Sequence, residues 1–339
     1  MDGARTGMTG QPPHFPEGPN LLLVRHAVRS WITDRSVNGT VCVGLSGGAD
    51  SLALTAACVA EGLRVRAVVV DHALQPGSAD IAEAAAERAR DLGCDSAEVV
   101  TVVVDGPGGP EAAARRARYA ALGSVRGELP VLLGHTLDDQ AETVLLGLAR
   151  GSGPRSLRGM APWDAPYGRP LLGVRRSATV GACAELGLDP WQDPQNTDPS
   201  FTRVRLRHEV LPLLEDVLRG GVADALARTA EQLREDGDVL DARAAELLDL
   251  TVDHGALELA PLSDVPAAIR RRVVREWLGT HGVPVRSDGQ LRAVDELIGR
   301  WRGQGGVAVA GGTHGERLVA VRRRGKLHLV RQTDRTRLE

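Results

Sequence analysis

The sequence predicts an α/β fold in which an N-terminal, doubly wound parallel sheet is followed by a smaller, mainly helical C-terminal domain. Between residues 40 and 150, short apolar runs rich in β-branched residues alternate with helical patterns, which is typical of βαβ units with helices on both faces of the sheet. From residue 222 onward, a long helical pattern with leucine at every seventh position replaces this alternation. The 339 residues suffice for two domains, and we expect the division at the glycine pair Gly220-Gly221.

The N-terminal domain is expected to cover residues 21–218, after a Gly- and Pro-rich stretch at 1–20. That stretch has no apolar core, so it is interpreted as a flexible leader and not as a signal peptide. Apolar periodicity predicts, in chain order, a helix at 21–31, a strand at 41–45, a helix after residue 51, a strand at 64–70, a helix at 78–92, a strand at 97–104, a helix at 110–126, a strand at 129–133 and a helix at 138–150.

The C-terminal domain is expected to cover residues 222–330, with a tail at 331–339. Its predicted elements are a helix at 222–250, helices near 266–279 and 288–301, and short strands near 307–310, 317–321 and 326–330. Basic residues cluster at Arg270, Arg271, Arg272 and Arg275, a pattern that suits an RNA-binding face and a solvated surface equally well.

The loop between the first strand and the following helix has the composition of an anion-binding site. It consists of Ser46, Gly47, Gly48, Ala49, Asp50 and Ser51. The glycines let the backbone approach a ligand closely, and the N–H groups of the helix's first turn face it with the positive end of the helix dipole. A carboxylate at Asp50 repels phosphate unless a divalent cation lies between them, so the loop predicts Mg²⁺ with Asp50 as its ligand. A tight turn with Ser or Asp as helix N-cap is the structural alternative. A Walker A loop is excluded, because it needs a lysine after its last glycine and the only lysine is Lys326.

Two further polar clusters follow strands of the predicted sheet. Asp71 and His72 end the second strand, and His135 follows the fourth, with Asp138 and Asp139 at the start of the next helix. Because ligands bind at the carboxyl ends of parallel strands, we expect these clusters to meet the loop at one rim. For Asp138, capping of the helix is an equally good explanation.

The loop resembles the pyrophosphate loop of the N-type ATP pyrophosphatases, the PP-loop superfamily, which split ATP between the α- and β-phosphates. Within that superfamily, most of residues 40–215 resembles the tRNA(Ile)-lysidine synthetase family in the order and spacing of its motifs. The matching segments are Val70–Leu74, Glu111–Arg115 with Arg118-Tyr119, Gly134–Thr143 with Arg150–Gly153, Arg169–Leu172, Asp193–Asp198, and Arg203–Arg207 with Leu211–Leu214. The chain departs from the family at Gln75, where arginine is common, and at Val204, where asparagine is common, so neither position is assigned a role.

This resemblance implies a PP-loop ATPase fold and a carbon–nitrogen ligase that converts ATP to AMP and pyrophosphate. The implied reaction joins free L-lysine to C2 of the wobble cytidine of the CAU-anticodon isoleucine tRNA, through an adenylated tRNA intermediate. Its product, lysidine, changes the codon that is read from AUG to AUA. The implied cofactors are ATP and Mg²⁺, and the implied partners are isoleucine tRNA and free L-lysine.

The resemblance also implies roles for individual residues. The implied catalytic residues are Asp50, Arg115, for the charge on the adenylate, and Asp139, near the lysine amine or the metal. The implied nucleotide-binding residues are Ser46, Gly47, Gly48, Ala49, Asp50, Ser51, Asp71, His72 and His135. The implied RNA-binding residues are Arg118, Arg203, Arg205 and Arg207. The last three alternate in sequence, which would place them on one face of a strand but spread them around a helix. Salt bridges to Glu209, Glu215 or Asp216 are the alternative explanation for them.

Composition and charge narrow the class of protein. The chain is 42% hydrophobic and 25% charged, with a net charge of −3, and has no run of about 18 apolar residues, so we expect a cytoplasmic protein with no membrane span. The four cysteines show no C-x-x-C spacing, which argues against a tRNA thiolase of the same superfamily. A nucleotide-gated RNA-binding module without turnover is the other alternative.

Overall fold

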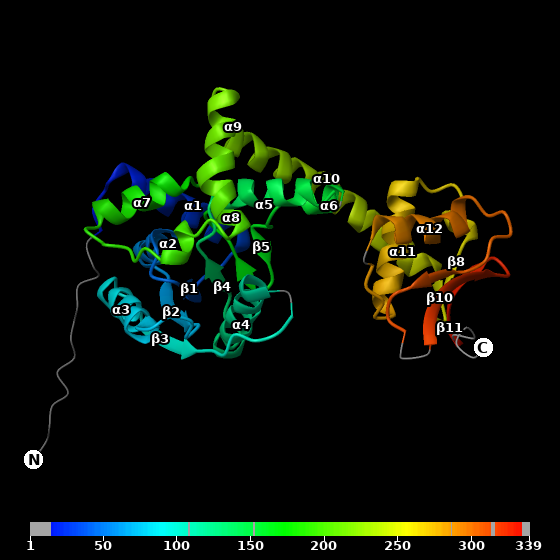
Figure 1. Cartoon of the computed structure of the whole chain (residues 1–339), viewed down its shortest axis with the longest axis horizontal. Coiled ribbons are helices and arrows are strands. Elements are labelled where there is room, and N and C mark those ends of the chain that lie inside the picture. Colours follow the sequence, from blue (N-terminus) through cyan, green and yellow to red (C-terminus); the bar gives the residue numbers. More distant parts are fainter. Residues whose placement is uncertain (1–14, 108, 152, 286, 313–315, 334–339) are drawn as a thin grey trace, which may run out of the picture. The chain divides into compact units, whose positions relative to one another are not determined.

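A computed structural model describes residues 15–107, 109–151, 153–285, 287–312 and 316–333 (Figure 1). Residues 1–14 of the expected leader and residues 334–339 of the expected tail lie outside the described residues. The chain divides into two compact units. Unit 1 comprises Met1–Leu145 and Gly159–Arg228, and unit 2 comprises Leu146–Arg158 and Thr229–Glu339. The division therefore differs from the single boundary expected near residue 220, because the segment 146–158 belongs to unit 2.

Unit 1 is built around a six-stranded sheet with the order β3-β2-β1-β4-β6-β5. Its strands are β1 (Thr40–Leu45), β2 (Arg64–Asp71), β3 (Ser96–Thr101), β4 (Val131–Leu133), β5 (Trp163–Asp164) and β6 (Tyr167–Gly168). The four expected strands are confirmed and pair in parallel, with Val43 opposite both Ala67 and Leu132. β6 continues in parallel beside β4, whereas β5 pairs antiparallel with β6. The sequence did not predict these last two strands, because two residues are too few to show an alternating pattern.

Helices cover both faces of this sheet, as the packing of β1 demonstrates. Val41 and Val43 lie in the large core cluster that includes residues of α1, α2 and α3, whereas Cys42 packs with Val68 and Leu122 in a second cluster. The helices of unit 1 are α1 (Pro19–Arg35), α2 (Ala49–Ala60), α3 (Ser78–Asp91), α4 (Gly109–Val125), α7 (Arg176–Glu185), α8 (Thr202–Arg205) and α9 (Leu211–Val217), with a π-helical turn, η2 (Leu206–Val210), between the last two. Helices α1, α2 and α7 pack together (Figure 1). The structure confirms the expected helices α1 to α4, whereas the sequence did not predict α7.

Two helices pass from one unit into the other. Helix α5 (Leu137–Ala149) begins in unit 1 and ends in unit 2, and so does α10 (Val222–Thr251). Both helices were expected from their apolar periodicity. A short helix, α6 (Pro154–Leu157), follows α5 within unit 2.

Unit 2 combines helices with a five-stranded antiparallel sheet in the order β7-β8-β11-β10-β9. Its further elements are α11 (Ala267–Thr280), α12 (Asp288–Gly299), β7 (Val252–Asp253), β8 (Ala256–Glu258), β9 (Val307–Val309), β10 (Glu316–Arg323) and β11 (Lys326–Thr333). The expected helices and the last three strands are confirmed, while β7 and β8 were missed. The fully buried Trp277 lies in the core of this unit. Nowhere in the described part of the chain is a helix both long and apolar enough to cross a bilayer.

Candidate active site

The loop Ser46–Ser51 joins β1 to α2 in the predicted arrangement of strand, loop and helix. Gly47 has a left-handed backbone (φ 79°), and a Cβ on it would come within 3.2 Å of a side chain of α3. The Ser51 hydroxyl donates to the Gly48 carbonyl over 2.9 Å and accepts from the backbone N–H of Ser46 over 3.1 Å. These bonds fold the loop against the start of α2, whose first N–H groups have no helical partner and are suited to an anion.

The end of β4 lies directly against this loop. A Cβ on Gly134 would lie 2.9 Å from the carbonyl carbon and oxygen of Asp50 and 3.0 Å from the nitrogen of Ser51. These are backbone atoms, so a larger residue would displace the loop itself. The close approach brings His135, the next residue, beside the loop.

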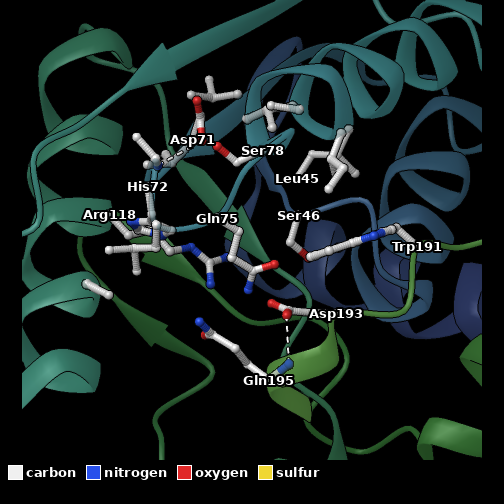
Figure 2. Close-up of a pocket in the computed structure, with 18 residues that line it drawn as sticks. Leu45, Ser46, Asp71, His72, Gln75, Ser78, Arg118, Trp191, Asp193 and Gln195 are labelled. Atoms are coloured by element: carbon white, nitrogen blue, oxygen red, sulfur yellow. Dashed lines mark hydrogen bonds between the residues drawn. The ribbon is translucent and has the colours of Figure 1, made fainter. Parts of the chain in front are cut away.

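A cavity of about 290 Å³, cavity A, borders the loop at the carboxyl ends of β1 and β2 (Figure 2). Its apolar lining includes Leu45, Val68, Val70, Leu74, Ile81 and Trp191. Its polar lining includes Ser46, Asp71, His72, Gln75, Arg118 and Asp193. In Figure 2, Ser46 and Trp191 lie next to each other on one side of the cavity, and His72 and Arg118 lie on the other. The mixture of apolar walls and a few polar groups is typical of small-molecule sites.

A larger cavity of about 520 Å³, cavity B, also borders the loop. It shares Ser46, Arg118, Trp191 and Asp193 with cavity A. The charged and polar side chains that line it include Asp50, His135, Asp139, Arg176, Arg207 and His208. The two predicted clusters thus meet the loop. Asp71 and His72 line cavity A, and His135 and Asp139 line cavity B.

Arg176, the first residue of α7, links the acidic side chains of cavity B. Its Nε donates to Asp50 over 3.0 Å, and its Nη2 donates to Asp139. The side chain of Glu142 is fully buried, lies 3.6 Å from Arg176, and accepts from the Nε of Arg207 over 2.8 Å. The sequence analysis gave no role to Arg176 or Glu142. Arg176 could not be found, because one arginine does not stand out in an arginine-rich chain. Glu142 could have been found, because it lies inside the matched segment Gly134–Thr143.

Burial and Arg176 have opposite effects on the pKa values of Asp50 and Asp139. Burial raises the pKa of Asp50, although Arg176 and the hydroxyl of Thr179, which donates to it, counteract the rise. Burial also favours neutral Asp139, but Arg176 and the backbone N–H of Thr136 outweigh it, so the pKa of Asp139 lies below its usual value. Asp139 is therefore ionised at neutral pH.

His72 and His135 are neutral imidazoles. Burial and, to a lesser degree, the charge of Arg118 lower the pKa of both, and the pKa of His135 falls to about 3 although Asp139 opposes the shift. The Nδ1 atoms of His72 and His135 are buried without a hydrogen-bond partner among the described residues. Burial also lowers the pKa of Arg118, and no carboxylate in the described ranges raises it. A half-buried guanidinium that lines both cavities and forms no ion pair among the described residues is suited to an anionic ligand.

Three of the predicted arginines, Arg115, Arg203 and Arg205, line neither cavity A nor cavity B, and all three make local contacts. Arg115 donates from Nη2 to the Tyr119 hydroxyl over 3.2 Å, and its guanidinium lies 4.8 Å from the centre of that ring. Arg205 is exposed and pairs with Glu209 over 2.9 Å, as the salt-bridge alternative predicts.

Arg203 and Arg207 lie four residues apart in α8 and η2 and share a carboxylate. Arg203 lies 3.9 Å from Glu142, to which Arg207 donates, and 3.3 Å from Glu111. The segment is helical, so the three alternating arginines are spread and Arg205 faces elsewhere.

The donors suited to a metal are few. Within the described ranges, no three His, Cys, Asp or Glu side chains form a group that could hold a metal ion. The carboxylates of Asp50, Asp139 and Asp193 line cavity B, and Arg176 pairs with the first two. The cysteines are free, and Cys42, Cys58 and Cys183 are buried.

Comparison with protein families gives two matches. The PP-loop domain matches residues 24–214, and the TilS substrate binding domain matches residues 257–328. The first match covers more than half of the chain and identifies it as a user of ATP.

Curated relatives match nearly the whole chain. A tRNA(Ile)-lysidine synthase of Nocardia farcinica is 64% identical over 91% of this chain and 98% of its own length. Proteins of the same name from Rhodococcus opacus and Mycobacterium tuberculosis H37Rv are 63% and 59% identical, over 93% and 86% of this chain and 97% and 90% of their own lengths.

Among solved structures, the U34-tRNA thiolase NcsA of Methanococcus maripaludis is similar, with a TM-score of 0.51 and 18% identity over 64% of this chain and 80% of that one. This likeness establishes a shared fold only. The family matches and the relatives' identity over most of both chains establish more: the chain belongs to the tRNA(Ile)-lysidine synthase family, whose catalytic domain is a PP-loop domain.

Proposed function

We propose that the protein adenylates the C2 oxygen of the wobble cytidine in the CAU-anticodon isoleucine tRNA, and that free L-lysine then displaces AMP to give lysidine. The observation that carries this proposal is that two cavities, each lined by apolar and charged residues, adjoin at one loop whose composition suits an anion. Two cavities on one loop suit a reaction in which ATP is split at its α-phosphate and a second substrate attacks there. We place the protein in the cytoplasm, where such a tRNA would be modified.

Cavity A suits the adenosine of ATP, and the loop suits its pyrophosphate. The apolar walls at Leu45, Ile81 and Trp191 would cover the base, and the N–H groups at the start of α2 would face the β- and γ-phosphates. Arg118 lines both cavities, so we assign to it the charge on the α-phosphate. Arg115, proposed for this role from the sequence, lines neither cavity and is engaged with a tyrosine.

The donors around the loop fit Mg²⁺, the hard cation that accompanies ATP. Magnesium prefers carboxylate and phosphate oxygens and uses only one or two protein carboxylates. Asp50 would supply one of them, once Arg176 releases its carboxylate. Bound there, the ion would neutralise charge on the leaving pyrophosphate.

In the first step, the C2 oxygen of cytosine forms a bond to the α-phosphorus and the bond from that phosphorus to pyrophosphate breaks. In the second, the ε-nitrogen of lysine bonds to C2 and the C2–oxygen bond breaks, so AMP leaves with the oxygen. The ammonium of lysine must first lose a proton. We assign the acceptance of this proton to Asp139, which is ionised and lines cavity B.

We assign tRNA contacts to the arginine-bearing segment 203–207 and to residues 222–330, which include the whole match to the substrate binding domain. Two alternatives are weaker. A thiolase would need cysteines that can carry sulfur, whereas three of the four cysteines here are buried. A binding module without turnover would release no pyrophosphate.

One experiment separates these functions. The protein is incubated with ATP labelled at the α-phosphate and isoleucine CAU tRNA, with and without lysine. Label should accumulate on the tRNA when lysine is withheld and leave as AMP when lysine is added, while a tRNA without the CAU anticodon stays unlabelled. Label that never reaches tRNA, or AMP release that ignores lysine, would contradict the proposed function.

A further inference from the structure

A third cavity of about 240 Å³, cavity C, adjoins the first two and has no part in the roles assigned so far. It shares Leu74 and Gln195 with cavity A and Asn196 and Arg207 with cavity B. Asp193 lines all three cavities. A ligand in cavity C would therefore lie beside the places assigned above to ATP and to lysine.

We infer that cavity C holds the wobble cytosine after the base has left its stack, an inference that rests on the proposed function. A base that reacts at C2 must be extruded from the anticodon loop, since stacked neighbours cover it. Proteins hold such bases by stacking a flat side chain on the ring and by hydrogen bonds to the ring's edge. Cavity C offers both features.

The stacking surface is Phe201. The chain has only two phenylalanines and two tyrosines, yet this half-buried ring lines a cavity, together with the aliphatic side chains of Leu74 and Val204. Aromatic rings stack on any base, so Phe201 would supply affinity and the polar lining would supply selectivity.

The polar lining matches the edge of cytosine. Cytosine carries an exocyclic amino group that donates, next to a ring nitrogen and a C2 oxygen that accept, whereas uracil has an oxygen in place of the amino group. Glu111 supplies a carboxylate acceptor, and Arg203 lies 3.3 Å from it. The amides of Gln195 and Asn196 supply donors for the other two atoms.

The size and position of cavity C favour a base over the other substrates. At about 240 Å³, cavity C is smaller than cavities A and B, which suits a single planar ring. A planar base can stack on the face of Phe201, whereas free lysine would meet the ring with a flexible chain or its ammonium only. Arg203 and Arg207 lie at the same cavity and can hold the phosphates on either side of an extruded nucleotide.

The test measures the base itself, using the full chain and isoleucine tRNA with the fluorescent analogue pyrrolocytosine at the wobble position. Stacking on Phe201 should quench the fluorescence when the wild-type protein binds. Phe201→Leu, which keeps an apolar side chain but removes the ring, should lose the quenching and weaken tRNA binding at least fivefold, as expected for one lost base stack. Phe201→Tyr restores a ring and should restore quenching. Leu213→Val, at an exposed position of the neighbouring α9, is the control.

A second variant tests the edge. Glu111→Leu removes the acceptor for the amino group, so the preference for a tRNA with cytosine over one with uracil at the wobble position should fall at least fivefold. Binding of ATP, which is assigned to cavity A, should stay unchanged in both variants and shows that they are folded.

The outcomes separate this inference from the proposed function. Quenching that persists in Phe201→Leu, or binding of labelled free lysine that this variant abolishes, would overturn the assignment of cavity C, even if the wild type transfers label to tRNA. Quenching that is lost in Phe201→Leu and restored in Phe201→Tyr supports the assignment of cavity C. If no label is transferred to tRNA in that case, only the proposed chemistry is contradicted.

Discussion

Arg176 donates from its Nε to the carboxylate of Asp50 over 3.0 Å, although 126 residues separate them in sequence. The same guanidinium donates to Asp139 and lies 3.6 Å from Glu142, so one side chain balances three carboxylates around cavity B. Arg176 thus supplies the positive charge between Asp50 and Asp139. This relationship leads to the first prediction.

Arg176→Gln should lower the free energy of unfolding by about 3 kcal/mol, because it leaves buried carboxylates without their countercharge. Arg175→Gln is the matched control. Arg175 pairs with Asp138 and Asp224, but its side chain is 41% exposed, so its loss should cost less than about 1 kcal/mol. Urea unfolding of both variants measures the difference. Equal losses would show that Arg176 does not balance the cluster.

Asp50→Ala should abolish pyrophosphate release from ATP while the thermal melt stays close to that of the wild type. The fold survives because Arg176 keeps its bond to Asp139, so no buried charge is left unpaired. Asp91→Ala, at the exposed end of α3, is the control for loss of a carboxylate. Normal pyrophosphate release by Asp50→Ala would remove Asp50 from the assignments for Mg²⁺ and catalysis.

Gly134→Ala should destabilise the protein by about 1–3 kcal/mol and weaken ATP binding, because the new Cβ would meet backbone atoms of Asp50 at 2.9 Å. Gly173→Ala tests the same chemical change at a position where nothing lies within 4 Å of the added atom. Calorimetry of ATP binding and urea unfolding are the measurements. If the two variants bind ATP equally well, the close approach of β4 does not shape the loop.

The buried imidazole of His135 predicts a pH dependence. Its pKa is lowered from 6.5 to about 3 in the folded chain, so the unfolded chain binds a proton that the native protein refuses as the pH falls. The stability that depends on the neutral ring is fully present above pH 6.5 and is lost progressively toward pH 3. His135→Gln should therefore flatten the change in unfolding free energy between pH 6 and pH 4 by up to about 1.4 kcal/mol per pH unit. His26→Gln, at an exposed position of α1, is the control, and an equal effect there would contradict the prediction.

Arg205 separates RNA binding from a purely local ion pair. If it contacts a tRNA phosphate, Arg205→Gln should weaken tRNA binding and reduce the slope of log affinity against log salt by about 0.7–0.9. Arg29→Gln removes a similarly exposed arginine of α1, which pairs with Glu61, and should leave the slope unchanged. Titrations at several salt concentrations measure both. An unchanged slope for Arg205→Gln would leave only its pair with Glu209.

The sequence predicted what local patterns determine and missed what long-range packing determines. The strand, loop and helix around Ser46–Ser51 followed from apolar periodicity and glycine spacing, and the structure has them within a residue or two. Arg176 acquires its role only because α7 packs beside α2, which no local pattern reveals. Trp191 also lines the cavities through a long-range contact, because its backbone N–H donates to the Gly47 carbonyl.

The passage of α5 and α10 between the units has a consequence for how this chain can be divided or recombined. The chain crosses from one unit to the other at residues 145–146, 158–159 and 228–229. Unit 2 is therefore not a cassette that can be exchanged by joining two genes at one site, because residues 146–158 would remain with the wrong parent. Arg158 within that segment donates to Asp241 of α10 over 2.7 Å, and Arg272 donates to the other oxygen of the same carboxylate. A chimaera of two relatives joined only near residue 220 would have to preserve this shared carboxylate across its two parents.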